Sequence, residues 1–430
     1  MKLFNQILIN TLVANFTNNF VSMALTFWIY LQTRSVLITA IVPGAYTVIS
    51  SLLGMWFGSI VDHNKKKNVM LFSSVITFCL YFIGLVIVIF TPEQLLIKIQ
   101  GINFWLFIIV IMFGVIVGTI RNISLSTLVT LLVPEENRDK ANGLVGSVNG
   151  IAFALTFVFI GFILTYTGIT GLLFIAIVLT LVAMLHISFI NIPEKEIIHT
   201  TGKPYKLDIK GTILIISGIP GLFALIFFNT INNLIGGVFS SLMDAYGLSI
   251  VSVKVWGILW GFFSLGSVLA GIIIAKKGLG ANPLKSMLWG NLIMSIIVIL
   301  FMANAWIVLF TVGVFCWICL MTFVEAAEQT LLQKVVPYEH QGKVFGFAQT
   351  IEQSVSPFVA FLIGPIAEFV FIPFMTKGTG VTLIGGWFGV GVGRGIALIF
   401  SIAGIIGLII SILALKSRSY KLLSCKYFEK

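Results

Sequence analysis

Long apolar stretches alternate along the whole chain with short polar or charged segments. A membrane-spanning helix needs roughly 20 mainly apolar residues, so stretches of this length predict spanning helices. We predict twelve of them, at residues 6–31, 37–61, 69–91, 102–131, 142–166, 169–190, 212–243, 251–275, 285–304, 306–332, 344–372 and 392–415. The expected fold class is an all-α membrane protein with twelve transmembrane helices.

The longest charged interval separates the sixth predicted span from the seventh. It runs from Asn191 to Gly211 and carries four lysines, two glutamates and one aspartate. We therefore predict an N-terminal six-helix half at 1–190, a cytoplasmic linker at 191–211 and a C-terminal six-helix half with a short cytoplasmic tail at 212–430.

An internal repeat supports this division into halves. The segment Val133–Gly143 reappears as Val336–Gly346. Matching pairs 203 positions apart are Pro134/Pro337, Glu136/Glu339, Lys140/Lys343, Gly143/Gly346 and Gly161/Gly364. Each copy joins the fourth span of its half to the fifth, so we expect two pseudo-symmetric halves related by a parallel repeat.

Composition and charge exclude a soluble globule and fix an orientation. Hydrophobic residues make up 58% of the 430 residues, charged residues 10%, and the mean hydropathy is +1.09. Of the 26 lysines and arginines, 20 fall in segments on one side of the predicted membrane and 5 on the other. The positive-inside rule then predicts that both termini are cytoplasmic. We expect a multi-pass protein of the bacterial plasma (inner) membrane. This placement of the basic residues argues against nucleic acid as a partner.

A glycine-acid-lysine motif stands between the second and third spans. It contains Gly54, Gly58, Asp62, Lys65 and Lys66. The two glycines share a helix face, where a neighbouring helix can approach closely, and Asp62 can pair with a basic residue or cap a helix N-terminus. We interpret these five residues as a conformational latch that forms when the cytoplasmic side is closed. The alternative is a packing motif followed by orienting lysines.

This motif resembles the Gly-x-x-x-Asp-x-x-x-(Arg/Lys)-(Arg/Lys) signature of the major facilitator superfamily. The loops Leu132–Glu136 and Gly342–Gly346 resemble those of its macrolide-efflux-like drug exporter branch. The resemblance implies a secondary active transporter that exports a small amphipathic drug-like molecule by alternating access, with proton antiport. The first span departs from many proton-coupled relatives, because it carries asparagines where they have an acidic residue.

Among the charged residues within predicted spans, four are candidates for function: Arg121, Glu325, Glu328 and Glu352. A charge at the centre of a spanning helix costs about 2.5–3.5 kcal/mol, so each needs a partner, water or a function. Glu325 and Glu328 are three residues apart on one helix face, which makes them our candidates for proton coupling. Alternatively, Glu328 reaches the cytoplasmic rim and Glu325 pairs with a basic side chain.

Two further interpretations stay open for Arg121 and Glu352. Arg121 is a candidate for binding an anionic group of the cargo, or for a salt bridge with Glu325. For Glu352 we favour a helix-packing or rim contact.

Asparagines gather in the first and seventh spans, which are counterparts in the two halves. They are Asn15, Asn18, Asn19, Asn229, Asn232 and Asn233. We predict that they line the cargo cavity; the alternative is hydrogen bonding between helices.

Other functions remain as alternatives. An exporter of an endogenous metabolite or siderophore would use the same architecture. A membrane-embedded enzyme is disfavoured because the sequence contains neither His-Glu-x-x-His nor Gly-x-Ser-x-Gly, and a non-transporting sensor would usually add a soluble domain. We expect a monomer, not an enzyme, whose partners are small-molecule cargo, protons and the lipid bilayer, with no cofactor and no metal.

Overall fold

The computed structural model describes residues 2–33, 36–194, 208–304 and 306–428. These residues form helices joined by short connections, and no strand occurs among them. Most of the predicted linker at 191–211 lies outside the described residues, because positions 195–207 are not among them.

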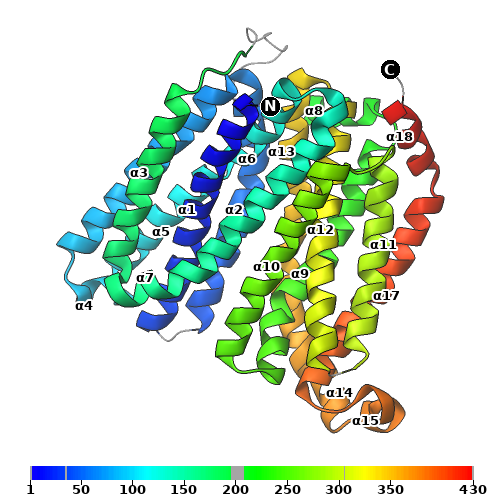
Figure 1. The fold of residues 1–430 in the computed structure, drawn as a ribbon. Helices are drawn as coiled ribbons and strands as arrows, with labels where there is room; N and C mark the ends of the chain where they lie inside the picture. The colour runs from blue at the N-terminus through cyan, green and yellow to red at the C-terminus, as the bar shows by residue number, and fades with distance from the viewer. Residues whose placement is uncertain (1, 34–35, 195–207, 305, 429–430) are drawn as a thin grey trace. The chain divides into compact units, whose positions relative to one another are not determined.

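The long helices agree with the predicted spans in number and order (Figure 1). The first half contains α1 (Lys2–Thr33), α2 (Val36–His63), α3 (Lys66–Phe90), α4 (Glu93–Leu96), α5 (Ile102–Gly118), α6 (Ile120–Leu132) and α7 (Arg138–Phe189). The second half contains α8 (Ile209–Gly218), α9 (Leu222–Ile250), α10 (Val253–Lys277), α11 (Pro283–Met302), α12 (Ile307–Val335), α13 (Gln341–Ile366), α14 (Ile372–Thr376), α15 (Gly380–Leu383), α16 (Gly385–Phe388), α17 (Val392–Lys416) and α18 (Arg418–Phe428).

Eleven helical segments of the described chain are long and apolar enough to cross a membrane. The twelfth long helix, α1, has 32 residues, and its asparagines lower its hydropathy. The protein is therefore a multi-pass helical membrane protein, as the apolar pattern predicts.

The predicted fifth and sixth spans both fall within α7. A kink at Gly168, whose φ of +61° is left-handed, divides this element into two helices between the two spans. Two segments of membrane-spanning length cover this region, Glu135–Ile160 and Phe162–Phe189, and Gly168 lies near the start of the second. A side chain would strain this backbone conformation, so glycine suits the position.

The seventh span differs from its predicted bounds of 212–243. The spanning helix α9 runs from Leu222 to Ile250, and the short helix α8 precedes it. Pro220 lacks a backbone N–H and Gly221 has a φ of +84°, so one helix cannot run through this point. The predicted boundary at 243 is wrong, because the helix continues past the charge of Asp244 to Ile250.

The repeated loop folds in the same way in both halves. A 3₁₀ turn follows each proline, η1 at Glu135–Asn137 and η2 at Tyr338–His340. In each turn the third residue donates its N–H to the carbonyl of the proline at 3.0 Å. The sequence repeat is thus also a structural repeat, and a long helix, α7 or α13, begins directly after each copy.

The chain forms two compact units. Unit 1 consists of Met1–Arg138, Val148–Thr212 and Val336–Thr350; unit 2 consists of Asp139–Ser147, Ile213–Val335 and Ile351–Lys430. Each unit therefore contains most of one predicted half, together with the first residues of the fifth span of the other.

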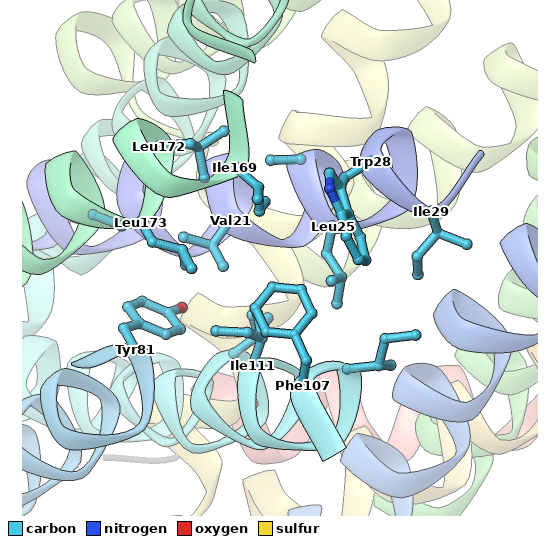
Figure 2. Packing of buried hydrophobic residues seen from close by; sticks show 14 of the residues in the cluster. Val21, Leu25, Trp28, Ile29, Tyr81, Phe107, Ile111, Ile169, Leu172 and Leu173 are labelled. Atoms are coloured by element: carbon cyan, nitrogen blue, oxygen red, sulfur yellow. The ribbon is translucent and has the colours of Figure 1, made fainter. Parts of the chain in front are cut away.

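Each unit has its own apolar core. In unit 1, α1 packs against α2 and α5, and α3 packs against α5 and α6. Figure 2 shows Leu25 and Trp28 of α1 opposite Phe107 of α5, and the rings of Trp28 and Phe107 meet edge to face at 5.1 Å. In unit 2, α11 packs against α12 and α17, with Phe239 stacked on Phe400 at 4.6 Å.

Candidate functional site

Two glutamates and an asparagine meet inside unit 2. Glu328 lies on α12, Glu352 on α13 and Asn229 on α9, and the three side chains interact with one another. Asn229 is 4% exposed and Glu352 is 9% exposed. The Nδ2 atom of Asn229 and the Oε1 atom of Glu352 have no hydrogen bond of good geometry among the described residues. This carboxyl cluster therefore brings together two acids and leaves buried polar atoms available for a further partner.

Glu325 lies one helical turn before Glu328 and interacts with it electrostatically. Its side chain is exposed, that of Glu328 is partly buried, and that of Glu352 is buried. The three acids thus form a series of increasing burial. The sequence grouped Glu325 with Glu328, whereas the structure places Glu328 in contact with Glu352, which we had interpreted as a packing or rim residue.

The asparagines of α9 differ in their surroundings. Asn233 donates to the carbonyl of Asn229 at 3.1 Å, within the helix. Asn232 is partly buried, and its Nδ2 atom has no partner among the described residues. Of the three predicted cavity residues on α9, only Asn229 contacts the carboxyl cluster in the described part of the chain.

Arg121 is buried in unit 1, with 4% of its side chain exposed. Its Nη1 atom donates to the carbonyl of Met70 at 3.0 Å and to the hydroxyl of Ser74 at 2.6 Å, and Nη2 donates to the amide oxygen of Asn10. All of these partners are neutral. Glu325 belongs to unit 2, and its salt bridge with Arg121 stays a prediction.

The predicted cavity asparagines of α1 also lie in unit 1. Asn15 donates to Oδ1 of Asn149 at 2.8 Å, which joins α1 to α7. Asn18 accepts a hydrogen bond from the hydroxyl of Tyr81 at 3.3 Å, and Asn19 is partly buried. Two of the three therefore make the interhelical hydrogen bonds that we had kept as the alternative.

Asp62 caps the first turn of α13 within unit 1. Its Oδ1 atom accepts from the backbone N–H of Gly342 at 2.6 Å, and its Oδ2 atom accepts from that of Lys343 at 2.8 Å. The first N–H groups of a helix lack partners within the helix and carry a partial positive charge. A carboxylate at this position satisfies two of them.

The motif glycines let α2 and α13 approach each other closely. A Cβ atom added to Gly58 would lie 2.1 Å from the carbonyl oxygen of Gly342, and one added to Gly54 would lie 2.7 Å from Oγ1 of Thr350. In addition, Thr350 donates its hydroxyl to the carbonyl of Ser51 at 2.6 Å. No other residue type fits at Gly58 without a shift of backbone.

The two motif lysines are not equivalent. Lys65 is exposed at the start of α3. Lys66 is 6% exposed, interacts with Asp62 and Glu194, and lies over the ring of Tyr338 at 5.1 Å. Glu194 also accepts the backbone N–H of Lys66 at 2.5 Å, so it caps α3 much as Asp62 caps α13.

Three charged residues with specific contacts are not among the site residues predicted from the sequence. Asp139 accepts from the backbone N–H of Leu279 at 2.9 Å, in unit 2. Asp244 accepts from the indole N–H groups of Trp256 at 2.8 Å and Trp260 at 3.1 Å.

The third of these residues, Arg394, lies at the start of the predicted twelfth span. It is 5% exposed in the first turn of α17 and donates to the carbonyls of Phe388, Met302 and Ala303. The signal that could have found Asp244 is the apolar pattern around it, which continues to Ile250. No comparable signal marks Asp139 or Arg394.

Twelve long helices in two related halves, with acids, an arginine and amides inside them, define a polytopic helical transporter. The model of the family described as Major Facilitator Superfamily matches residues 7–361. The chain therefore belongs to the major facilitator superfamily, whose members carry small molecules, often together with ions. No curated protein matches the chain.

Solved structures share the fold at low sequence identity. A bacterial homologue of the iron transporter ferroportin, in an outward-facing state, has a TM-score of 0.71 at 13% identity and covers 97% of this chain and 100% of its own. The human organic anion transporter MFSD10 (TETRAN) has a TM-score of 0.68 at 11% identity, with 95% and 99% covered. The proton:xylose symporter XylE has a TM-score of 0.68 at 14% identity, with 96% of each chain covered. These likenesses describe the fold alone.

Proposed function

We propose that this transporter exports a small amphipathic, drug-like molecule in exchange for protons. The resemblance of its two repeated loops to the macrolide-efflux-like branch supports a drug-like cargo. We further propose that it works as a monomer in a bacterial plasma membrane, with both termini in the cytoplasm, as the distribution of lysines and arginines predicts.

The contact between Glu328 and Glu352 is the observation that carries the proposal. Two carboxylates in contact repel each other strongly in a poorly solvated site, so the pair needs a proton or a cation between them. An exchanger needs a group that takes up a proton on one side and releases it on the other. Two acids and an amide inside the helices have the chemistry for that step.

Glu325 is the proposed contact for a positively charged group of the cargo. It is exposed, and it lies one helical turn from Glu328 on α12. Binding of a cation next to Glu328 makes proton loss from the cluster easier, because the positive charge stabilises the carboxylate form. This competition would couple cargo binding to proton release.

The glycine-acid motif is the proposed conformational latch. The bonds from Gly342 and Lys343 to Asp62 would form and break during alternating access, when the first turn of α13 moves relative to α2. Lys66 is proposed to steady the carboxylate of Asp62, whereas the exposed Lys65 would only help to orient the chain in the membrane.

Transport by the purified protein in proteoliposomes tests this function. We expect an imposed pH gradient to drive uptake of a labelled cationic drug from a panel that includes macrolides, and cargo addition to move protons the opposite way. Glu328→Gln and Glu352→Gln should abolish the dependence on the gradient. Glu368→Gln is the matched control, because Glu368 is an exposed acid on the same helical segment, about 24 Å further along by helix rise. Gradient-driven transport that survives in both cluster variants would refute proton coupling through this pair.

A further inference from the structure

A small cavity with several polar side chains in its lining lies inside unit 1. It has a volume of about 20 Å³ and lies between α1, α3, α7 and the junction of α5 with α6. Its polar lining includes Asn18, Ser73, Ser74, Thr77, Tyr81 and Arg121. A water molecule needs roughly 10–15 Å³ of such space, so the cavity holds one particle of that order of size and no organic cargo.

The guanidinium of Arg121 brings an unbalanced positive charge to this cavity. Arginine is always protonated in proteins, and this one is 4% exposed. Its hydrogen-bond acceptors are a carbonyl, a hydroxyl and an amide, and none of them is charged. Its Nε atom is buried and has no partner among the described residues. Buried charges in membrane helices are normally paired, so a counter-charge is missing from the described part of unit 1.

The buried positive charge of Arg121 favours an anion over a cation, and two side chains keep donors for it. Every serine and threonine hydroxyl that lines the cavity donates to a backbone carbonyl, as Ser73 does to Val117 at 2.9 Å. The hydroxyl of Tyr81 donates to Oδ1 of Asn18, which turns the Nδ2 donors of that amide away from Tyr81. Nε of Arg121 and Nδ2 of Asn18 are then the donors left for a guest. No acidic side chain lines the cavity in the described part of the chain.

We propose that this cavity binds a small monovalent anion of the size of chloride, held by Arg121 and Asn18. The anion supplies the negative charge that the neutral partners of Arg121 lack. It joins α1 and α6 at one point, so it stabilises unit 1. This site is independent of the proposed proton coupling in unit 2, and either can fail without the other.

Halide-specific stabilisation of the full-length protein in detergent is the first test. Thermal unfolding is followed while sodium chloride replaces sodium gluconate at constant ionic strength. Binding to the folded state alone should raise the Tm by roughly 2 °C or more with a saturable dependence on chloride. Bromide should act like chloride. The same Tm in chloride, bromide and gluconate would overturn the proposal.

The variant Asn18→Asp tests the location. It places a carboxylate in the cavity beside Arg121, where the carboxylate takes the place of the anion. We expect its Tm in gluconate to reach at least that of the wild type in chloride, and its response to chloride to be lost. Asn15→Asp is the matched control, because it adds the same charge one turn away on α1, outside the cavity, and should keep the response. A full chloride response in Asn18→Asp would place any anion elsewhere and overturn the proposal.

Bromide diffraction gives an answer that depends on no variant. Crystals of the wild-type protein grown in bromide should show an anomalous peak within hydrogen-bond distance of Nε of Arg121. A cavity that contains only water gives no peak there, and that result would overturn the proposal even if chloride stabilises the protein.

Discussion

Asp139 accepts a hydrogen bond from the backbone N–H of Leu279 in unit 2. The equivalent contact in unit 1 joins Asp62 to the backbone N–H of Gly342, but there the acid and the N–H donor stand at the opposite positions of the repeat. Asp139 is the repeat equivalent of Gly342, 203 positions earlier. Leu279 follows Asp62 by 217 positions. The same two offsets relate a second pair of contacts: Ser147 donates to the carbonyl of Val268, and Thr350 donates to that of Ser51.

The two halves thus keep the same contact and place the acid on opposite partners. This explains why Leu279, the second-half counterpart of Asp62, is not an acid. A backbone N–H at either position needs an acceptor, and a carboxylate on either side supplies it. We infer that both contacts serve the same purpose, one in each unit.

Removing the charge of Asp62 should slow transport. Hydrogen bonds to a charged group contribute about 1.5–3 kcal/mol, and Asp62 accepts two of them, so Asp62→Asn should shift the latch equilibrium and lower the initial rate about tenfold or more. Asp139→Asn should have a smaller effect, because only one of the two bonds that Asp139 accepts reaches another helix: the bond from Leu279 does, whereas the bond from Lys140 stays within its own turn. Glu136→Gln removes an exposed charge from the same loop as Asp139 and should leave the rate unchanged. Rates of Asp62→Asn within twofold of the wild type would contradict the latch.

Gly58→Ala should destabilise the protein, whereas Gly44→Ala on the same helix should not. A Cβ atom at Gly58 would meet the carbonyl of Gly342 at 2.1 Å, and overpacking of this kind costs about 1–3 kcal/mol. At Gly44 no atom lies within 4 Å of the added Cβ, and alanine is the better helix former by about 1 kcal/mol. Thermal unfolding in detergent measures both. Equal Tm changes in the two variants would show that the close approach of α2 and α13 carries no stability.

The fold could be predicted from the sequence because a membrane imposes a length on each apolar stretch. The repeat around Pro134 and Pro337 also predicted that both loops fold alike, since a local sequence decides a local turn. The error at 212–243 has a local cause as well. At the start of the span, the proline and glycine at positions 220 and 221 break the helix before α9. At its end, the apolar pattern continues past Asp244, and the helix continues with it to Ile250.

The contacts within the site were less predictable, because they depend on side chains from different helices. Nothing in the sequence around Glu352 says that it meets Glu328, which is on another helix. The motif residue Asp62 was easier, since its spacing from the two glycines is itself the signal. The role of Asp139 could not be predicted from the sequence, because it becomes clear only when its contact with Leu279 is compared with the contact between Asp62 and Gly342.

Asp244 should stabilise the start of α10 through the tryptophan indoles. Trp256 is 5% exposed, and Asp244→Ala would leave its N–H without its acceptor at a cost of about 1–3 kcal/mol. Asp244→Asn keeps an oxygen that can accept, so it should recover most of the stability. Thermal unfolding followed by tryptophan fluorescence measures both variants. If alanine and asparagine give the same Tm, the hydrogen bond contributes nothing and the packing of the rings alone holds the pair.

Glu325→Gln and Glu352→Gln should fail in different ways, because the two acids differ in exposure and partners. The exposed Glu325 is the proposed contact for a cationic cargo, so its variant should raise KM for a cationic drug about tenfold and leave kcat and the response to a pH gradient unchanged. For a neutral drug of similar size its KM should stay the same. The buried Glu352 contacts Glu328 and not the cargo, so its variant should keep KM and lose the response to the gradient. Transport rates measured in proteoliposomes over a range of cargo concentrations, with and without the gradient, separate the two. Identical defects in both variants would mean that the three acids act as one binding group, and the assignment of cargo to Glu325 and of the proton to the Glu328–Glu352 pair would be wrong.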